Sequence, residues 1–259
     1  MKRIVVKIGG AILEQPLASL FEGLAELRQT AEVILVHGGG PQTTAMAARL
    51  GHQPTIVEGR RVTTDLDLDI LHWVIRGQLN VNLTAEAAKC GIEAVGLSGA
   101  DAGIVQVTKR PPWTVQGKEV DFGHVGDFVK ANPTALLALL SAGFLPIVCP
   151  PGIDANGGLF NINADTMALE IAVSVQADEL LMVTESGGVL NREKQPIRRL
   201  SAHEAQQGVA EGWIVGGMKV KTDNGFQCLG RGVQTVWILG PESVSSKTRG
   251  TQLRPNTNA

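Results

Sequence analysis

Short apolar runs alternate along the chain with longer stretches in which apolar residues recur at helical spacing. The runs predict buried strands at residues 4–8, 33–36, 94–97, 144–149, 180–184 and 235–239. The helical spacing predicts helices at residues 17–28, 43–50, 65–89, 135–141, 164–175, 202–210 and 218–229. Apolar strands that alternate with helices indicate a parallel sheet covered on both faces. We therefore expect an α/β fold, a three-layer αβα sandwich with a mainly parallel central sheet.

Two segments and the tail depart from this alternation. Residues 104–129 combine β-branched residues with Pro111-Pro112 and Gly117, which predicts β-hairpin excursions from the main sheet. Within them we expect a hairpin turn at Gly123-His124-Val125-Gly126. Residues 191–200 predict a shorter excursion, and the polar tail after Gly240 is expected to fray.

Composition and charge exclude several classes of protein. The 259 residues include 23 Lys and Arg against 25 Asp and Glu, so no basic excess exists to bind a nucleic-acid backbone. Cys90, Cys149 and Cys228 lie far apart and the His residues show no metal-ligand spacing, so we expect no protein metal site. The longest apolar stretch, residues 135–151, is broken by prolines, and the N-terminus lacks a signal-peptide pattern. These features favour a cytoplasmic protein that does not interact with a membrane.

Glycines follow four of the predicted strands. The clusters are Lys7-Ile8-Gly9-Gly10, His37-Gly38-Gly39-Gly40, Gly96-Leu97-Ser98-Gly99 and Thr184-Glu185-Ser186-Gly187-Gly188. One such pair indicates only a tight turn. Four clusters at the carboxyl edge of one parallel sheet favour a polyphosphate site, because glycine lets backbone N–H groups approach phosphate closely. The chain has no GxxxxGK[ST] motif and no GxGxxG after the first strand, which disfavours a P-loop enzyme and a dinucleotide reductase.

Charged and amide side chains near these clusters are candidates for catalysis and binding. Lys7 ends an apolar strand, where a lysine either reaches solvent or contacts a phosphate, and the glycines after it favour phosphate. Lys221 lies near a predicted helix start, where a solvated surface lysine is an equal alternative. At least one residue of Asn161-Ile162-Asn163-Ala164-Asp165 is expected to cap the next helix, and a carboxylate between two lysines would hold both ammonium groups. Arg60-Arg61 is either a solvated pair or the source of a guanidinium for a carboxylate.

Together these motifs resemble the amino-acid kinase family, and within it the acetylglutamate kinase branch. They follow the family's order across nearly the whole chain: Lys7-Ile8-Gly9-Gly10, His37-Gly38-Gly39-Gly40, Arg61-Val62-Thr63, Gly123-His124-Val125-Gly126, Asn161-Ile162-Asn163-Ala164-Asp165, and Gly217-Met218 with Lys221. Each motif is weak alone, but the set is specific. In the nucleotide loop, Glu185-Ser186 stands where the family usually has Asp-Val.

The resemblance implies roles for the matching residues in a single domain of two lobes. Lys7 and Lys221 would contact the transferring phosphoryl group, and Asp165 would organise these lysines. The acceptor would bind in a lobe of about residues 1–165, through Gly39, Gly40, Arg61 and Asn161. Gly9 and Gly10 would line the phosphate path. The nucleotide would bind in a lobe of about residues 166–259, through Thr184, Glu185, Gly188, Leu190, Val215, Gly217 and Met218.

The implied reaction transfers the γ-phosphoryl group of ATP, with Mg²⁺, to the side-chain carboxylate of N-acetyl-L-glutamate, in arginine biosynthesis. A Glu carboxyl has a pKa of about 4.3, so the acceptor is already ionised near neutral pH and needs no general base. The resemblance also implies a homodimer, because arginine-inhibited hexameric members carry an N-terminal helix and this chain begins almost at its first predicted strand. The alternatives are an N-succinylglutamate or carrier-linked aminoadipate acceptor, or a non-catalytic small-molecule sensor, which we would expect to have lost one lysine.

Overall fold

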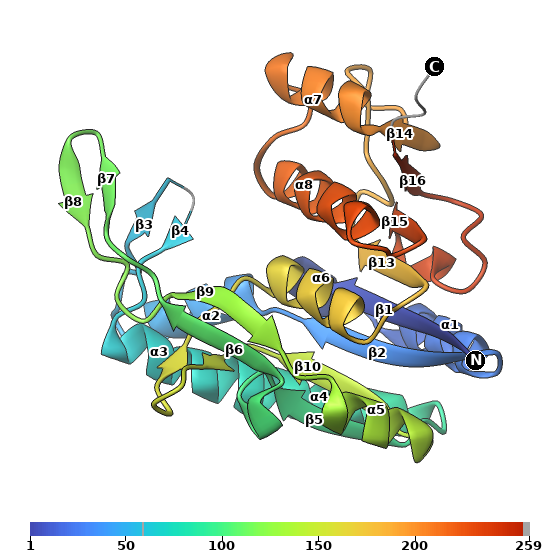
Figure 1. Ribbon diagram of the computed structural model, residues 1–259, viewed down its shortest axis with the longest axis horizontal. Coiled ribbons are helices and arrows are strands. Elements are labelled where there is room, and N and C mark those ends of the chain that lie inside the picture. Colours follow the sequence, from blue (N-terminus) through green and yellow to red (C-terminus); the bar gives the residue numbers. More distant parts are fainter. Residues whose placement is uncertain (59, 256–259) are drawn as a thin grey trace.

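The central β-sheet contains every apolar run that the sequence predicts as a strand (Figure 1). The computed structural model describes residues 1–58 and 60–255. The strands of the sheet are β1 (Lys2–Ile8), β2 (Ala31–His37), β5 (Ala94–Ser98), β10 (Leu145–Cys149), β13 (Glu179–Val183), β14 (Arg199–Ser201), β15 (Thr235–Leu239) and β16 (Thr251–Arg254), in the order β14-β16-β15-β13-β1-β2-β10-β5. Neighbouring strands are parallel except β15 and β16, so the sheet is mainly parallel, as predicted.

Helices cover both faces of this sheet and complete the three predicted layers. One face packs against α1 (Ala18–Arg28) and α4 (Asn80–Lys89), and the other against α5 (Thr134–Ser141), α6 (Ala164–Ser174) and α8 (Gly216–Gly230). The other helices are α2 (Gly40–Arg49), α3 (Asp65–Leu71) and α7 (Ala202–Ala210), with 3₁₀ turns at Gly10–Glu14, Asp101–Gly103 and Pro241–Ser243. A π-helical segment, His72–Leu79, joins α3 to α4, so the helix expected at residues 65–89 is present with this one irregular stretch. Within the described residues, no helix is long and apolar enough to cross a bilayer.

The alternation of side chains along β1 decides where Lys7 points. Ile4 and Val6 belong to the core beneath α1 and α4, whereas Val5 belongs to the core beneath α6. Because side chains in a strand point to opposite faces in turn, Lys7 lies on the same face as Val5. The strand therefore directs this lysine toward α6.

The segment at residues 104–129 forms antiparallel strands, as predicted. Strand β6 (Val105–Lys109) pairs with β9 (Gly126–Ala131), and β7 (Trp113–Val115) pairs with β8 (Lys118–Val120). Two short strands, β11 (Gly152–Ile153) and β12 (Leu159–Phe160), extend the β6–β9 sheet. A further hairpin, β3 (Ile56–Val57) with β4 (Arg60–Arg61), stands beside β7-β8 in Figure 1. The Arg60 guanidinium lies 5.1 Å from the ring centroid of Trp113, so the two hairpins touch.

The expectation of a hairpin turn at residues 123–126 is wrong. Gly123 makes a parallel bridge with Thr63, and Val125 makes one with Asn161. The φ angle of Gly123 is 67°, and a Cβ there would lie 2.3 Å from the carbonyl oxygen of Thr63. Glycine is therefore required because two distant segments of the chain contact each other closely at this position. The local sequence does not reveal this contact, since the same residues are also typical of turns.

The expectation that the tail frays is wrong for β16. This strand lies between β14 and β15, and Leu253 is 2% exposed in the core. The strand contributes few apolar residues among polar neighbours, so the pattern along the chain is weak. Strand β16 is held in place because it pairs with β14 on one side and β15 on the other.

A buried polar network ties β2 to α4 behind the glycine cluster of β2. The Nδ1 of His37 lies 2.9 Å from the carbonyl oxygen of Gly38, and its Nε2 lies 3.0 Å from Nδ2 of Asn80. A carbonyl only accepts, so Nδ1 carries the proton and Nε2 accepts from the amide. The amide orientation is set because Asn80 also donates to the carbonyl of Ile147 and accepts from Arg76. Burial lowers the pKa of His37 to about 4, so the ring is neutral in the folded protein.

We expect the free energy of unfolding to fall as the pH is lowered from about 6.5 to about 4. In the unfolded chain His37 takes up a proton near pH 6.5. In the folded chain it does so only near its lowered pKa of about 4, so protonation between these pH values favours the unfolded state. The neutral His37 ring contributes about 3 kcal/mol to the free energy of unfolding. This contribution is fully present above the pKa of the unfolded state and is lost as the pH falls to the pKa of the folded state. Urea denaturation at several pH values tests it by comparing the wild type with His37→Gln, which should show a shallower pH dependence. Equal pH dependences would contradict this assignment.

Candidate active site

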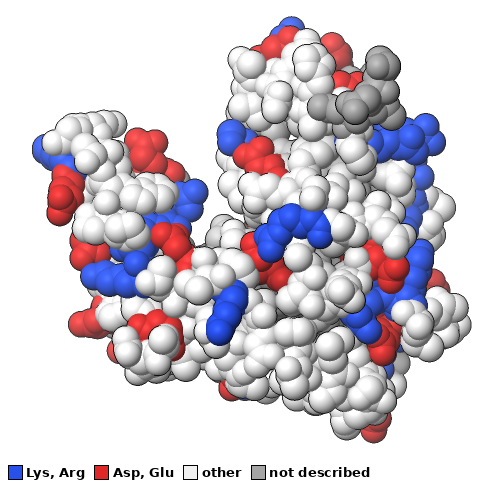
Figure 2. Space-filling model, viewed as in Figure 1, with Lys and Arg blue, Asp and Glu red and all other residues white. Residues whose placement is uncertain are grey.

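A cavity of about 450 Å³ opens at the carboxyl ends of β1 and β2, beside the β3-β4 hairpin. This volume lies within the range of small-molecule sites, roughly 300–1,000 Å³. Figure 2 shows the surface hollowed between the two hairpins and the part of the molecule that carries α7 and α8. The larger apolar side chains of the lining are Ile56, Leu71, Ile75, Val125 and Ile162, and most other lining residues are glycine, polar or charged.

Lys7 and Asp165 line this cavity, and the Asp165 carboxylate lies between Lys7 and a second lysine, Lys221. Lys7 Nζ is 2.9 Å from Oδ1 of Asp165, and Lys221 Nζ is 3.7 Å from Oδ2 of the same residue. Lys7 is 3% exposed, so it does not reach bulk solvent as an ordinary strand-end lysine would. Burial lowers the pKa of Lys7 and the nearby Lys221 lowers it further, while Asp165 acts to raise it.

Three elements meet to form this triad. Lys7 comes from β1, Asp165 from the first turn of α6, and Lys221 from α8. Asn163 caps α6, because its side chain accepts from the backbone N–H groups of Asp165 and Thr166. The cap fixes the first turn of α6 and with it the carboxylate that faces both lysines.

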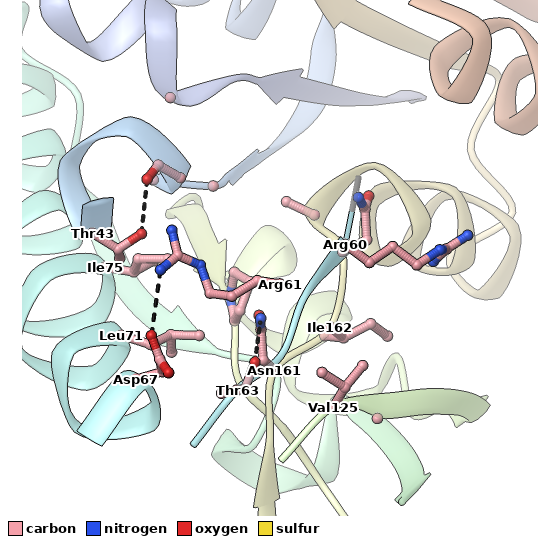
Figure 3. Close-up of a pocket in the computed structure, with 18 of the residues that line it drawn as sticks. Thr43, Arg60, Arg61, Thr63, Asp67, Leu71, Ile75, Val125, Asn161 and Ile162 are labelled. Carbon is pink, nitrogen blue, oxygen red and sulfur yellow. Dashed lines mark hydrogen bonds and ion pairs between the residues drawn. The ribbon is translucent and has the colours of Figure 1, made fainter. Parts of the chain in front are cut away.

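The predicted acceptor residues face the same cavity (Figure 3). Arg61 Nη2 donates to Thr44 Oγ1 at 2.6 Å, and its Nη1 lies 3.4 Å from Oδ1 of Asp67. Asn161 Nδ2 donates to Thr63 Oγ1 at 3.3 Å. These contacts orient a guanidinium and an amide at the cavity, where both groups can donate to a carboxylate.

Asp67 is a buried residue of this cavity that the sequence analysis missed. Its Oδ2 accepts hydrogen bonds from the backbone N–H and the hydroxyl of Thr64, and Nε2 of His52 lies 3.2 Å from its Oδ1. Burial acts to raise the pKa of Asp67, but the hydrogen bonds from Thr64 and the nearby His52 ring together lower it. The spacing Thr64-x-x-Asp67 is a capping-box signal for α3 and could have identified the carboxylate, although not its contact with Arg61.

The glycines of the first two clusters differ in what surrounds them. A Cβ on Gly10 would lie 2.5 Å from Cδ of Pro41, and one on Gly39 would lie 2.6 Å from Cδ1 of Leu79. These two glycines let the loop after β1, the start of α2 and the π-helical segment approach each other. A Cβ on Gly40 would meet no atom within 4 Å, and one on Gly9 would meet only Lys7 Nζ, at 4.0 Å. Gly9 and Gly40 therefore leave open space where a ligand can approach the backbone.

Of the residues predicted to bind the nucleotide, Gly10 lines this cavity, whereas those after β13 and at the start of α8 lie outside it. Thr184 donates its N–H to the carbonyl of Leu239, and Glu185 Oε1 accepts from Nε2 of Gln15 at 2.7 Å. Gly188 packs near Thr251, and Leu190 forms a bridge with Pro196. At the other segment, Val215 is exposed, Gly217 has Lys221 Nζ beside it, and Met218 packs on the core.

The residues at the start of α8 fit an anionic ligand better than a bare metal ion. Helix α8 has no side-chain cap and no acidic residue in its first turn, and a Cβ on Gly217 would meet only Lys221 Nζ, at 3.9 Å. The positive end of the helix dipole and the adjacent lysine can therefore hold phosphate. In the part of the chain that the structure describes, no three His, Cys, Asp or Glu residues are placed to hold a metal ion. Mg²⁺ fits here only when carried by the phosphates of a nucleotide, together with water.

Comparison with known proteins assigns the chain to a family. The model of the amino acid kinase family matches residues 2–240. An acetylglutamate kinase of Anaeromyxobacter dehalogenans (strain 2CP-C) is 41% identical over 250 residues, which are 93% of this chain and 92% of that protein. An acetylglutamate kinase of Methanopyrus kandleri is 37% identical over 253 residues, which are 96% and 99% of the two chains.

A solved structure has a similar fold over nearly the whole of this chain. The N-acetylglutamate synthase from Neisseria gonorrhoeae, complexed with coenzyme A and N-acetyl-glutamate, has a TM-score of 0.83 and 26% identity to this chain. The match covers 99% of this chain and 60% of that one. Since the family model spans most of the chain and the kinase relatives match it over nearly their whole length, the chain belongs to the amino acid kinase family.

Proposed function

We propose that this protein transfers the γ-phosphoryl group of ATP to the side-chain carboxylate of N-acetyl-L-glutamate, giving N-acetyl-L-glutamyl 5-phosphate for arginine biosynthesis. The observation that carries the proposal is the convergence of Lys7 and Lys221 on Asp165, beside a cavity that presents Arg61. The acetylglutamate kinase relatives support the choice of acceptor, because they match the chain over nearly its whole length. The synthase related in fold supports it too, because it was solved with N-acetyl-glutamate.

The acceptor binds in the 450 Å³ cavity, and two of its features suit an acylated acidic amino acid. Arg61 and Asn161 provide donors for its α-carboxylate. The apolar side chains in the lining provide a surface for the acyl group. Gly40 leaves the backbone at the start of α2 open to the substrate, and Gly39 beside it contributes its backbone to the same wall of the cavity. The side-chain carboxylate of the substrate then extends toward Lys7.

The main barrier to this reaction is electrostatic. An anionic carboxylate must approach an anionic phosphate, and a pair of unit charges about 4 Å apart at an effective dielectric constant near 20 interacts by roughly 4 kcal/mol. Lys7 and Lys221 offset part of this repulsion and stabilise the charge on the transferring group. Asp165 compensates the charge of the buried Lys7 in the resting protein and holds both ammonium groups in place. The acceptor is ionised already, so no base is required.

The nucleotide binds on the other side of the two lysines. In this proposal two segments contact the nucleotide. The loop after β13 contributes Thr184, Glu185, Gly188 and Leu190, and the start of α8 contributes Val215, Gly217 and Met218. Gly9 and Gly10 line the path of its phosphates. Mg²⁺, carried by the phosphates, supplies additional positive charge. Residues of about 1–165 thus form an acceptor lobe and residues of about 166–259 a nucleotide lobe.

Two alternative functions are compatible with the same fold. A different acid, such as N-succinylglutamate or a carrier-linked aminoadipate, would use the same lysines and differ only in the acceptor cavity. A non-catalytic sensor is disfavoured because both lysines and their shared carboxylate are in contact.

We also propose that the protein is a homodimer, which light scattering of the purified chain tests. A cytoplasmic location is a prediction from the sequence.

We expect the purified protein to form an acyl phosphate with ATP, Mg²⁺ and N-acetyl-L-glutamate. Hydroxylamine converts an acyl phosphate to a hydroxamate, which a colorimetric assay measures. The panel should include N-succinylglutamate, free glutamate and N-acetylaspartate, each at the same concentration. Preferential reaction with another acid would overturn the acceptor assignment, and reaction with none of them would support the sensor.

We expect Lys7→Ala and Lys221→Ala each to lower kcat by roughly 100- to 1,000-fold, the loss typical of one charge-stabilising contact in the transition state. Lys219→Ala is a matched control, because Lys219 lies on the same helix and pairs with Asp223 at 2.7 Å on an exposed face. It should leave kcat near the wild-type value. Circular dichroism separates lost catalysis from lost folding. A lysine whose removal leaves turnover nearly normal has no part in this mechanism.

We expect Arg61→Ala to raise the KM for the acceptor by roughly 10- to 100-fold, because a charged hydrogen bond contributes about 1.5–3 kcal/mol. The KM for ATP should change little. Arg61→Lys keeps the charge but not the planar fork, so its effect should be intermediate. Steady-state kinetics with each substrate varied in turn measure both constants. A change confined to the KM for ATP would show that Arg61 does not bind the acceptor carboxylate.

A further inference from the structure

A second ion pair joins the two helices that carry Asp165 and Lys221. Glu170 of α6 accepts two hydrogen bonds from Arg231, the C-cap residue of α8. The two bonds measure 2.7 Å (Nη1 to Oε1) and 2.9 Å (Nη2 to Oε2). Paired parallel bonds between a guanidinium and a carboxylate set the orientation of the two groups as well as their separation.

This pair is built into the packing of the helices. The side chain of Glu170 is 10% exposed and that of Arg231 is 43% exposed. Helices α6 and α8 pack against each other along this contact. The hydrogen bonds to Glu170, the largest cause, raise the pKa of Arg231, and burial acts against them. Removal of either partner therefore breaks a contact between the helices, and removal of Arg231 also leaves a buried carboxylate without its charge partner.

The two ion pairs lie at separate points along the same helices. Glu170 is about 7.5 Å beyond Asp165 along α6, and Arg231 is about 15 Å beyond Lys221 along α8, at 1.5 Å per residue. The contact of Lys221 with Asp165 is 3.7 Å, longer than a hydrogen bond, and α8 otherwise packs on α6 and on the sheet through its buried face. The bidentate pair adds a second, directional contact between α6 and α8 at the carboxyl end of α8.

Lys7 needs no such support. It extends from β1, which is hydrogen-bonded to a strand on each side, and its Nζ contacts Asp165 at 2.9 Å. Lys221 extends from α8, which side-chain packing and the Glu170–Arg231 pair hold against α6. The two lysines of the site therefore differ in what holds them.

We propose that Glu170 and Arg231 are positioning residues that act through Lys221: their ion pair fixes α8 on α6 so that the Lys221 ammonium stays beside Asp165. The proposal rests on the role of Lys221 in the proposed function. It concerns residues outside the cavity, and neither of them contacts the reacting groups.

The first test reads the position of Lys221 without using activity. An amine-acylating reagent is applied to the wild type, Glu170→Gln and Arg231→Ala, and mass spectrometry gives the labelling rate of Lys221 relative to that of the exposed Lys219. We expect this ratio to rise several-fold in both variants, because the freed ammonium leaves Asp165. Arg231→Lys, which keeps the charge but not the paired bonds, should give a smaller rise.

The second test is kinetic. We expect Glu170→Gln and Arg231→Ala to lower kcat by roughly 10- to 100-fold, the scale of a misplaced catalytic group, with both KM values within about twofold of wild type. The same substitutions in a Lys221→Ala background should cause little further loss of kcat, because positioning residues that act through Lys221 have nothing left to position. Equal losses in both backgrounds would overturn the proposal.

A matched control separates positioning from stability. Glu179 is another buried carboxylate, 5% exposed, which pairs with Lys2 and Lys247 at the amino end of β13, at the opposite edge of the sheet. Glu179→Gln should lower the melting temperature without changing kcat or the labelling ratio. If the Glu170 and Arg231 variants behave like this control, their ion pair is only structural and the proposal fails. If the wild type phosphorylates no acid, the proposed function fails, while the labelling ratio still decides the positioning of Lys221.

Discussion

The placement of one carboxylate between two ammonium groups is the constraint on which this site depends. A buried lysine is costly unless an opposite charge compensates it, and Asp165 provides that charge for Lys7. The same carboxylate faces Lys221, so it holds together two cations that would otherwise repel each other. The arrangement holds positive charge where water is largely excluded, and such a charge attracts an anion more strongly there than in water.

The fold satisfies this constraint by bringing three elements to one edge of the sheet. Alternation along β1 directs Lys7 to the α6 face, the Asn163 cap fixes the first turn of α6, and α8 delivers Lys221. The sheet holds the first lysine rigidly, whereas the second depends on how α8 lies on α6. The bidentate contact of Glu170 with Arg231 joins these two helices, which is why we propose that it positions the second lysine.

Much of the fold and part of the site follow from local pattern. The apolar runs predict the central strands because a buried strand must be apolar on both faces, and Lys7 is recognisable because a charge interrupts such a run. Other features have no strong local signal. Strand β16 is short and mostly polar, and residues 123–126 look like a turn although they bridge Thr63 and Asn161. Their conformations are set by partners far away in the chain.

The sequence by itself determined the α/β class, the six apolar central strands with the helices between them, and the residue types able to bind an anion, because these depend on periodicity and side-chain chemistry within short windows. The tertiary structure alone decided which distant charges meet. It placed Asp165 between its lysines, Asp67 against Arg61, and Glu170 on Arg231. The physical reason is that an ion pair depends on separation in space, which falls to a few ångströms only after the helices have packed on the sheet.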